Sequence, residues 1–214
     1  MSNARRRREQ RGFRPSQAKK SNASIRWLSW TVGAGLLAVV LIVGVVLSRG
    51  ISSGSSASRG AAAASAPAVG SLAPNASFST LQGPSVSIAS LRGQPTLVWF
   101  VSTWCSSCEA GTHAMASSIS QLQSDGVRVV ELEMYDDLGQ SGPSMASFVH
   151  TYAGQAASNP DWSFGQASAA ATLRYDPRGY LDIYYLLNKS GQIVYMNSSP
   201  AATMGSLLAK AQSV

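Results

Sequence analysis

The feature that most constrains the fold of this chain is a pair of cysteines, Cys105 and Cys108, at the junction of a predicted strand and a predicted helix. Residues 96–101 form a short apolar run of β-branched and aromatic side chains, the pattern of a strand buried on both faces. Residues 107–123 contain no proline and repeat small or apolar side chains at helical spacing, and an Asp-Gly pair ends the segment. The pair is therefore predicted to lie where a buried strand enters the amino end of a helix.

This position favours redox chemistry. The first turn of a helix presents unpaired N–H groups and the positive end of its dipole, so the pKa of Cys105 is expected to fall below the free value of about 8.5. Cys108 lies one helical turn further on, roughly 5 Å away between Cα atoms, which is within reach of a disulfide. Half of a zinc site is the alternative, but the only histidines are His113 and His150, and His113 is poorly placed on the helix to join Cys108.

A second feature is the apolar run 27–47, which holds 21 residues without a charge. As a helix it would be about 31 Å long, which matches the hydrocarbon core of a bilayer. A cleaved secretory signal is the competing interpretation. Its apolar core is typically only 7–15 residues long, and here the nearest alanine-rich stretch begins about 14 residues beyond the run. The sequence therefore predicts an uncleaved transmembrane anchor.

The net charge of +7 is concentrated before this anchor. Residues 1–26 contain nine Lys or Arg and one Glu, whereas the rest of the chain sums to −1. Positive flanks stay in the cytoplasm, so residues 1–26 are predicted to be a cytoplasmic tail of a single-pass protein of the cell membrane, with everything after the anchor outside. Binding of the tail to nucleic acid or anionic lipid is the alternative; no nucleic-acid partner is expected. A dithiol outside the cytoplasm lies where disulfides persist.

Beyond the anchor the chain divides into a linker and a domain. Residues 48–70 are rich in Ser, Gly and Ala and are expected to act as a flexible tether. Residues 71–214 alternate short predicted strands and helices, including a strand at 127–134 that would complete a parallel strand–helix–strand unit. Strands at 182–187 and 192–196 flank an Asn-Lys-Ser-Gly turn and predict an antiparallel hairpin. The fold class is therefore α/β.

Three segments carry a resemblance to membrane-anchored thioredoxin-like proteins of the TlpA/ResA (redoxin) type. The first segment is 72–78 together with 86–93, the second runs from the strand at residue 97 to the cysteines at 104–108, and the third is 185–194. The whole resemblance spans about residues 69–214. It implies a thioredoxin-like three-layer fold, a central mixed sheet flanked by helices, and thiol–disulfide exchange with partner proteins. It also implies a redox-active disulfide with no cofactor or metal, in which Cys105 is the nucleophile and Cys108 resolves. Relatives act in cytochrome c maturation, so a membrane-spanning electron donor or acceptor is a further expected partner.

The resemblance also suggests supporting residues. Trp104 would shield the disulfide, Ser106 and Ser107 lie between the cysteines, and Glu109 stands where a basic residue or Pro is common. An adjacent carboxylate such as Glu109 is expected to raise the thiol pKa values. Asp182 occupies the position at which the family usually carries a cis-proline facing the disulfide.

Three further positions depart from what a buried strand or a thioredoxin would carry. Trp99 stands where thioredoxins have a buried Asp, and Glu131 and Glu133 interrupt a strand that should be covered on both faces. One hypothesis is that one of these glutamates relays protons for the dithiol. The alternative is a strand end that emerges into solvent.

The favoured function is an extracytoplasmic thiol–disulfide oxidoreductase in which Cys108 resolves a mixed disulfide formed by Cys105. A copper-binding chaperone of the Sco type is one alternative, although that family uses CxxxC and a distal His, and no His lies near Tyr180. A peroxiredoxin-like peroxidase is another. It needs a Pro and a Thr or Ser ahead of the cysteine; Ser102 fits, but Val98 stands where the Pro belongs.

Overall fold

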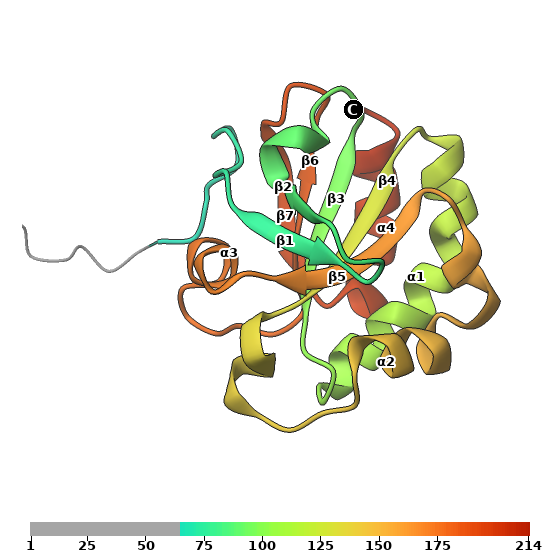
Figure 1. The fold of residues 1–214 in the computed structure, drawn as a ribbon. Coiled ribbons are helices and arrows are strands. Elements are labelled where there is room, and N and C mark those ends of the chain that lie inside the picture. Colours follow the sequence, from blue (N-terminus) through green and yellow to red (C-terminus); the bar gives the residue numbers. More distant parts are fainter. Residues whose placement is uncertain (1–64) are drawn as a thin grey trace, which may run out of the picture. The chain divides into compact units, whose positions relative to one another are not determined.

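The computed structural model describes residues 65–214 (Figure 1). The predicted cytoplasmic tail, transmembrane segment 27–47 and most of the 48–70 linker lie outside the described residues. Among the helices of residues 65–214, none combines the length and the hydropathy that a membrane span requires.

A seven-stranded mixed sheet in the order β2-β1-β5-β4-β3-β6-β7 forms the centre of the domain. The strands are β1 Ser77–Thr80, β2 Ser85–Ser87, β3 Thr96–Val101, β4 Arg128–Glu133, β5 Trp162–Ala167, β6 Ile183–Leu187 and β7 Ile193–Ser198. Strands β3, β4 and β5 run parallel, and β6 pairs antiparallel with both β3 and β7. The predicted parallel strand–helix–strand unit and the predicted hairpin are thus both confirmed.

Helices cover the two faces of the sheet. They are α1 Ser106–Ser124, α2 Met145–Tyr152, α3 Ala169–Tyr175 and α4 Pro200–Ala211, with short 3-10 helices at Ile88–Leu91, Tyr135–Gly139 and Gly154–Ser158. Side chains of α1, α2 and α4 share one core cluster with one face of the sheet, whereas α3 contributes to the cluster on the other face. This is the three-layer α/β arrangement that the resemblance to thioredoxin-like proteins implies.

Strand β3 fixes the position of the cysteines. All six of its residues are buried, and it lies between β4 and β6 near the centre of the sheet. Its side chains alternate between the two cores: Trp99 faces α1, and Phe100 stacks on Tyr175 with ring centroids 5.0 Å apart. Burial of each such aromatic side chain contributes about 2–3 kcal/mol, so the carboxyl end of β3 is firmly held.

Candidate active site

Cys105 occupies the N-cap position of α1, four residues after the end of β3. Its sulfur accepts a hydrogen bond from the backbone N–H of Cys108 at 3.3 Å, and the hydroxyl of Ser107 lies 3.1 Å from it. N-cap side chains commonly accept such a bond, and here the acceptor is a sulfur. Neither cysteine is part of a disulfide in this structure.

The surroundings of Cys105 stabilise its thiolate. Its pKa is lowered from 9.0 to about 6, chiefly because the Cys108 thiol donates a hydrogen bond to it. Burial opposes this shift, whereas the Ser107 hydroxyl and the backbone N–H groups of Cys108 and Ser107 support it. At neutral pH Cys105 is therefore mostly ionised, which is the reactive form of a cysteine.

Cys108 is the opposite case. Its side chain is fully buried, and its sulfur accepts a hydrogen bond from the N–H of Ser102 at 3.5 Å. Its pKa is raised far above the ordinary range, first by the hydrogen bond that it donates to Cys105, then by burial and by the negative charge of Asp182. The pair is thus chemically asymmetric: both sulfurs are buried, but Cys105 is mostly a thiolate at neutral pH whereas Cys108 stays a protonated thiol.

Asp182 immediately precedes β6 and is completely buried. Its Oδ1 accepts a hydrogen bond from Trp99 Nε1 at 2.9 Å, while its Oδ2 has no hydrogen-bond partner. Burial raises its pKa to about 7, the Trp99 N–H opposes the rise, and the charge of Cys105 adds to it. A carboxyl group that changes protonation state near neutral pH therefore lies beside the two cysteines.

Glu131, in β4, is a second buried acid on the same face of the sheet. Thr112 Oγ1 lies 2.8 Å from Glu131 Oε1 and 3.0 Å from the carbonyl oxygen of Cys108. A hydroxyl carries a single hydrogen, so the Thr112 O–H is shared between these two acceptors. Burial raises the pKa of Glu131 to about 8, and the hydrogen bond from Thr112 opposes the rise.

Asp137 holds the loop that leads into Cys105. Its carboxylate accepts hydrogen bonds from the N–H of Thr103 at 2.9 Å and from the Thr103 hydroxyl at 2.6 Å. Its carbonyl oxygen accepts from the indole N–H of Trp104 at 2.8 Å, and the Trp104 ring remains 37% exposed. Trp104 therefore lies at the surface directly before the nucleophile, and its shielding of the disulfide stays a prediction.

Comparisons with known proteins identify the family. The model of the AhpC/TSA family matches residues 69–195, which is more than half of the chain. The chain belongs to the AhpC/TSA family. A comparison with curated proteins found no match.

Solved structures share the fold of this AhpC/TSA family member. A Chlorobium tepidum protein assigned as thiol:disulfide interchange protein DsbE superposes with a TM-score of 0.53 at 14% identity, covering 68% of this chain and 98% of that chain. The thioredoxin domain of a thiol-disulfide oxidoreductase from Bacteroides vulgatus gives 0.51 at 18% identity, covering 67% and 99%. A thiol:disulfide interchange protein from Bacteroides sp. gives 0.50 at 18% identity, covering 66% and 91%. These similarities establish a thioredoxin-like fold.

The remaining predicted site residues of this AhpC/TSA family member divide into two groups. Ser107 lies against the Cys105 sulfur, whereas Ser106 is an exposed residue at the start of α1. Glu109 does not act as expected, because the carboxylate that raises the pKa of Cys108 belongs to Asp182. The Glu109 carboxylate instead raises the pKa of the Tyr152 hydroxyl.

Asp137 and Thr112 were not singled out from the sequence. No sequence pattern marks Asp137. Its contact with Thr103 depends on a turn in which three consecutive residues, 136–138, have φ between 49° and 58°. For Thr112 the signal is its position four residues after Cys108, which places the two on the same face of α1. Within residues 65–214, no group of three His, Cys, Asp or Glu side chains is arranged to hold a metal ion.

Proposed function

We propose that this protein is a thiol–disulfide oxidoreductase that exchanges electrons between its Cys105–Cys108 pair and the cysteines of partner proteins. The observation that carries the proposal is the asymmetry of the two thiols, one a helix-capping thiolate and the other a buried, protonated thiol. Such a pair suits a nucleophile and a resolving group. The thioredoxin-like fold supports the same conclusion.

In the reducing direction the Cys105 thiolate attacks one sulfur of a partner disulfide. The Cys105–partner bond forms, the partner S–S bond breaks, and the departing sulfur takes up a proton. Cys108 then loses its proton and attacks the Cys105 sulfur, which forms the Cys105–Cys108 disulfide and releases the second partner thiolate. Two electrons pass to the partner, and the same steps in reverse oxidise a dithiol.

The proton that Cys108 loses needs an acceptor, and Asp182 is the proposed one. Its Oδ2 is buried and without a partner, and its pKa of about 7 allows it to accept and release a proton near neutrality. Glu131 touches the Cys108 carbonyl only through Thr112 and is the second candidate. Glu133, the other glutamate considered from the sequence, instead bonds Gln166 and is only half-buried.

The proposal includes the membrane topology predicted from the sequence. Anchored by residues 27–47, the domain would act outside the cytoplasm, and a membrane-spanning electron donor or acceptor would restore its redox state. A membrane-impermeant thiol reagent added to intact cells should label Cys105. Labelling only after cell lysis would place the domain inside and remove this part of the proposal.

Trapping the intermediate tests the exchange reaction itself. A Cys108→Ser variant should accumulate a mixed disulfide between Cys105 and its partners, visible as a shift that reductant reverses. A Cys105→Ser variant is the matched control and should form none. An equal yield of mixed disulfide from both variants would contradict the assigned roles.

Peroxide reduction is a second candidate, because a low-pKa cysteine beside a resolving cysteine is also an arrangement that peroxide oxidises. Peroxide would convert Cys105 to a sulfenic acid, and Cys108 would condense with it, releasing water and forming the same disulfide. Stoichiometric peroxide consumption by the reduced protein would favour this candidate over protein disulfide exchange.

A further inference from the structure

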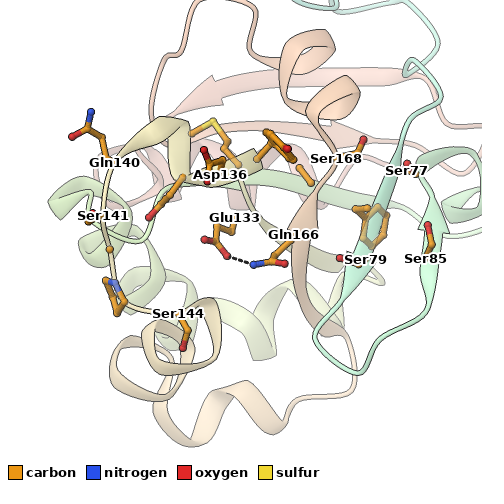
Figure 2. Close-up of a pocket in the computed structure, with 17 residues that line it drawn as sticks. Ser77, Ser79, Ser85, Glu133, Asp136, Gln140, Ser141, Ser144, Gln166 and Ser168 are labelled. Carbon is orange, nitrogen blue, oxygen red and sulfur yellow. Dashed lines mark hydrogen bonds between the residues drawn. The ribbon is translucent and has the colours of Figure 1, made fainter.

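A cavity of about 680 Å³ lies beside the active-site loop and is not used by the proposed mechanism (Figure 2). Three segments line it: the β1–β2 hairpin, the end of β4 with the loop that follows it to Ser144, and the end of β5. We call this cavity the polar groove. Neither cysteine is among its lining residues.

The floor of the polar groove is a row of polar side chains on neighbouring strands. Ser85 pairs with Ser79, Ser79 with Gln166, and Gln166 with Glu133. Paired residues present their side chains on the same face of a sheet. On the same face of β5, Trp162 and Phe164 are buried in the core. The polar residues of the row therefore stand where apolar side chains would be expected.

This row is not covered by the helices of its face. Gln166 and Ser85 are exposed, and Ser79 and Glu133 are half-buried. Figure 2 shows Glu133 and Gln166 meeting in the centre of the cavity, where Gln166 Nε2 donates to Glu133 Oε2 at 2.8 Å. Polar side chains at an uncovered position of the sheet are available to a bound molecule.

The polar groove lies beside the loop that carries the nucleophile. Its row continues to Val101, which pairs with Glu133 and lies four residues before Cys105. The opposite wall is the loop after β4, which Asp137 ties to Thr103 and Trp104. Gly142 in that wall packs so closely that an added Cβ would lie 2.2 Å from Thr103 Oγ1. A chain bound in the groove would therefore lie next to the active-site loop.

The residues that line the polar groove carry negative charge, which favours binding of a positively charged molecule. Three acids, Glu133, Asp136 and Asp137, line the polar groove, and no Lys, Arg or His does so among the described residues. Burial raises the pKa of Glu133, the Gln166 amide opposes the rise, and the charge of Asp137 adds to it. A cationic side chain would supply the counter-charge that this carboxylate lacks, and the surrounding hydroxyl and amide groups suit the N–H and C=O groups of a peptide.

We infer that the polar groove binds an extended, lysine- or arginine-bearing segment of the polypeptide whose disulfide is exchanged at Cys105. This inference rests on the proposed function. It names the class of substrate: a protein cysteine flanked by basic residues rather than a small disulfide.

Two synthetic peptides with the same internal disulfide test the inference, one flanked by three lysines and the other by three glutamates. Hydroxyethyl disulfide serves as a small, uncharged substrate that does not need the groove. For the wild-type protein at low salt, kcat/KM for the lysine peptide should exceed that for the glutamate peptide at least tenfold. The Glu133→Gln/Asp136→Asn double variant should reduce this preference to less than threefold, with unchanged rates on hydroxyethyl disulfide.

Two further variants separate groove binding from a general charge effect. Asp125→Asn removes an equivalent charge at the far end of α1 and should keep the preference. Ser79→Tyr should fill the groove and raise KM for the lysine peptide at least fivefold, without affecting hydroxyethyl disulfide. Equal rates for the two peptides, or a wild-type KM for the lysine peptide in Ser79→Tyr, would overturn the inference. If the protein still exchanged with hydroxyethyl disulfide, the proposed function would stand. Absence of exchange with every disulfide would overturn both.

Discussion

Replacing Asp182 by Asn should make the domain more stable at neutral and alkaline pH and slower as a catalyst. Asn is nearly isosteric with Asp, its Oδ1 can accept the same bond from Trp99, and it tolerates the left-handed backbone of this position, where φ is 67°. Oδ2 of Asp182 has no hydrogen-bond partner, and the Nδ2 group of Asn, which takes its place, would have none either. The substitution therefore changes mainly the ability to ionise.

The magnitude follows from the pKa shift. In the folded protein the pKa of Asp182 is about 7 rather than the ordinary 3.8, because burial disfavours the charged form. The unfolded state therefore releases a proton between pH 4 and 7 that the folded state retains, and stability falls as pH rises through this window. At about 1.4 kcal/mol for each pKa unit, the loss is about 4 kcal/mol above pH 7. A domain of this kind has an unfolding free energy of only about 5–15 kcal/mol.

Urea unfolding of the reduced protein at pH 4.5 and pH 8 measures this effect. Asp182→Asn should match the wild-type protein within about 1 kcal/mol at pH 4.5 and exceed it by about 2–4 kcal/mol at pH 8. Asp125→Asn is the control and should differ by no more than about 0.5 kcal/mol at either pH. The stabilised variant should also resolve mixed disulfides at least tenfold more slowly, because general acid–base groups contribute about that much or more.

An Asp182→Asn variant that is no more stable than wild type at pH 8 would refute this reasoning, because the carboxyl would then ionise at its ordinary pKa. A variant that gains stability but resolves mixed disulfides at the wild-type rate would keep the electrostatic argument. It would, however, remove Asp182 from the proton transfer.

Three further outcomes are expected. Ser107→Ala should raise the pKa of Cys105, because the hydroxyl group that lowers this pKa is lost. The pH profile of alkylation by iodoacetamide measures the shift, and an unchanged profile would show that the contact between Ser107 and Cys105 is not a hydrogen bond. Thr112→Val should destabilise the reduced domain by about 1–3 kcal/mol in urea unfolding, because Glu131 and the Cys108 carbonyl lose their shared hydrogen-bond partner. An unchanged unfolding free energy would contradict the two hydrogen bonds of Thr112. The reduced protein should consume peroxide far more slowly than it reduces a peptide disulfide, and the reverse order in a coupled assay would favour the peroxidase alternative.

The strand–helix junction could be predicted because its signals are local. The apolar run of β3, the proline-free stretch of α1 and the Asp-Gly stop are properties of short segments, and the structure reproduces them within one residue. The parallel pairing of β3 with β4 followed from the helical connection between them. The strand pattern put Asp182 at the start of β6, but only the resemblance to a known family suggested that it faces the disulfide.

The electrostatics could not be predicted, because they depend on contacts between distant segments. Glu109 is adjacent to Cys108 in sequence, but the charge that acts on Cys108 comes from Asp182, more than seventy residues further along. Glu131 was recognised as unusual for a central strand, yet its bond to Thr112 depends on how α1 packs over β4. The turn that brings Asp137 to Thr103 needs three positive φ angles in non-glycine residues, a conformation that sequence patterns rarely signal.

The most direct test of the account is the pH dependence of alkylation of each cysteine in the reduced protein, resolved by mass spectrometry. Cys105 should react first, with an apparent pKa of about 6, and Cys108 should stay unmodified across the neutral range. Reaction of Cys105 only with a pKa near its ordinary 9.0, or faster reaction of Cys108, would contradict the assignment of a helix-capping thiolate as the nucleophile.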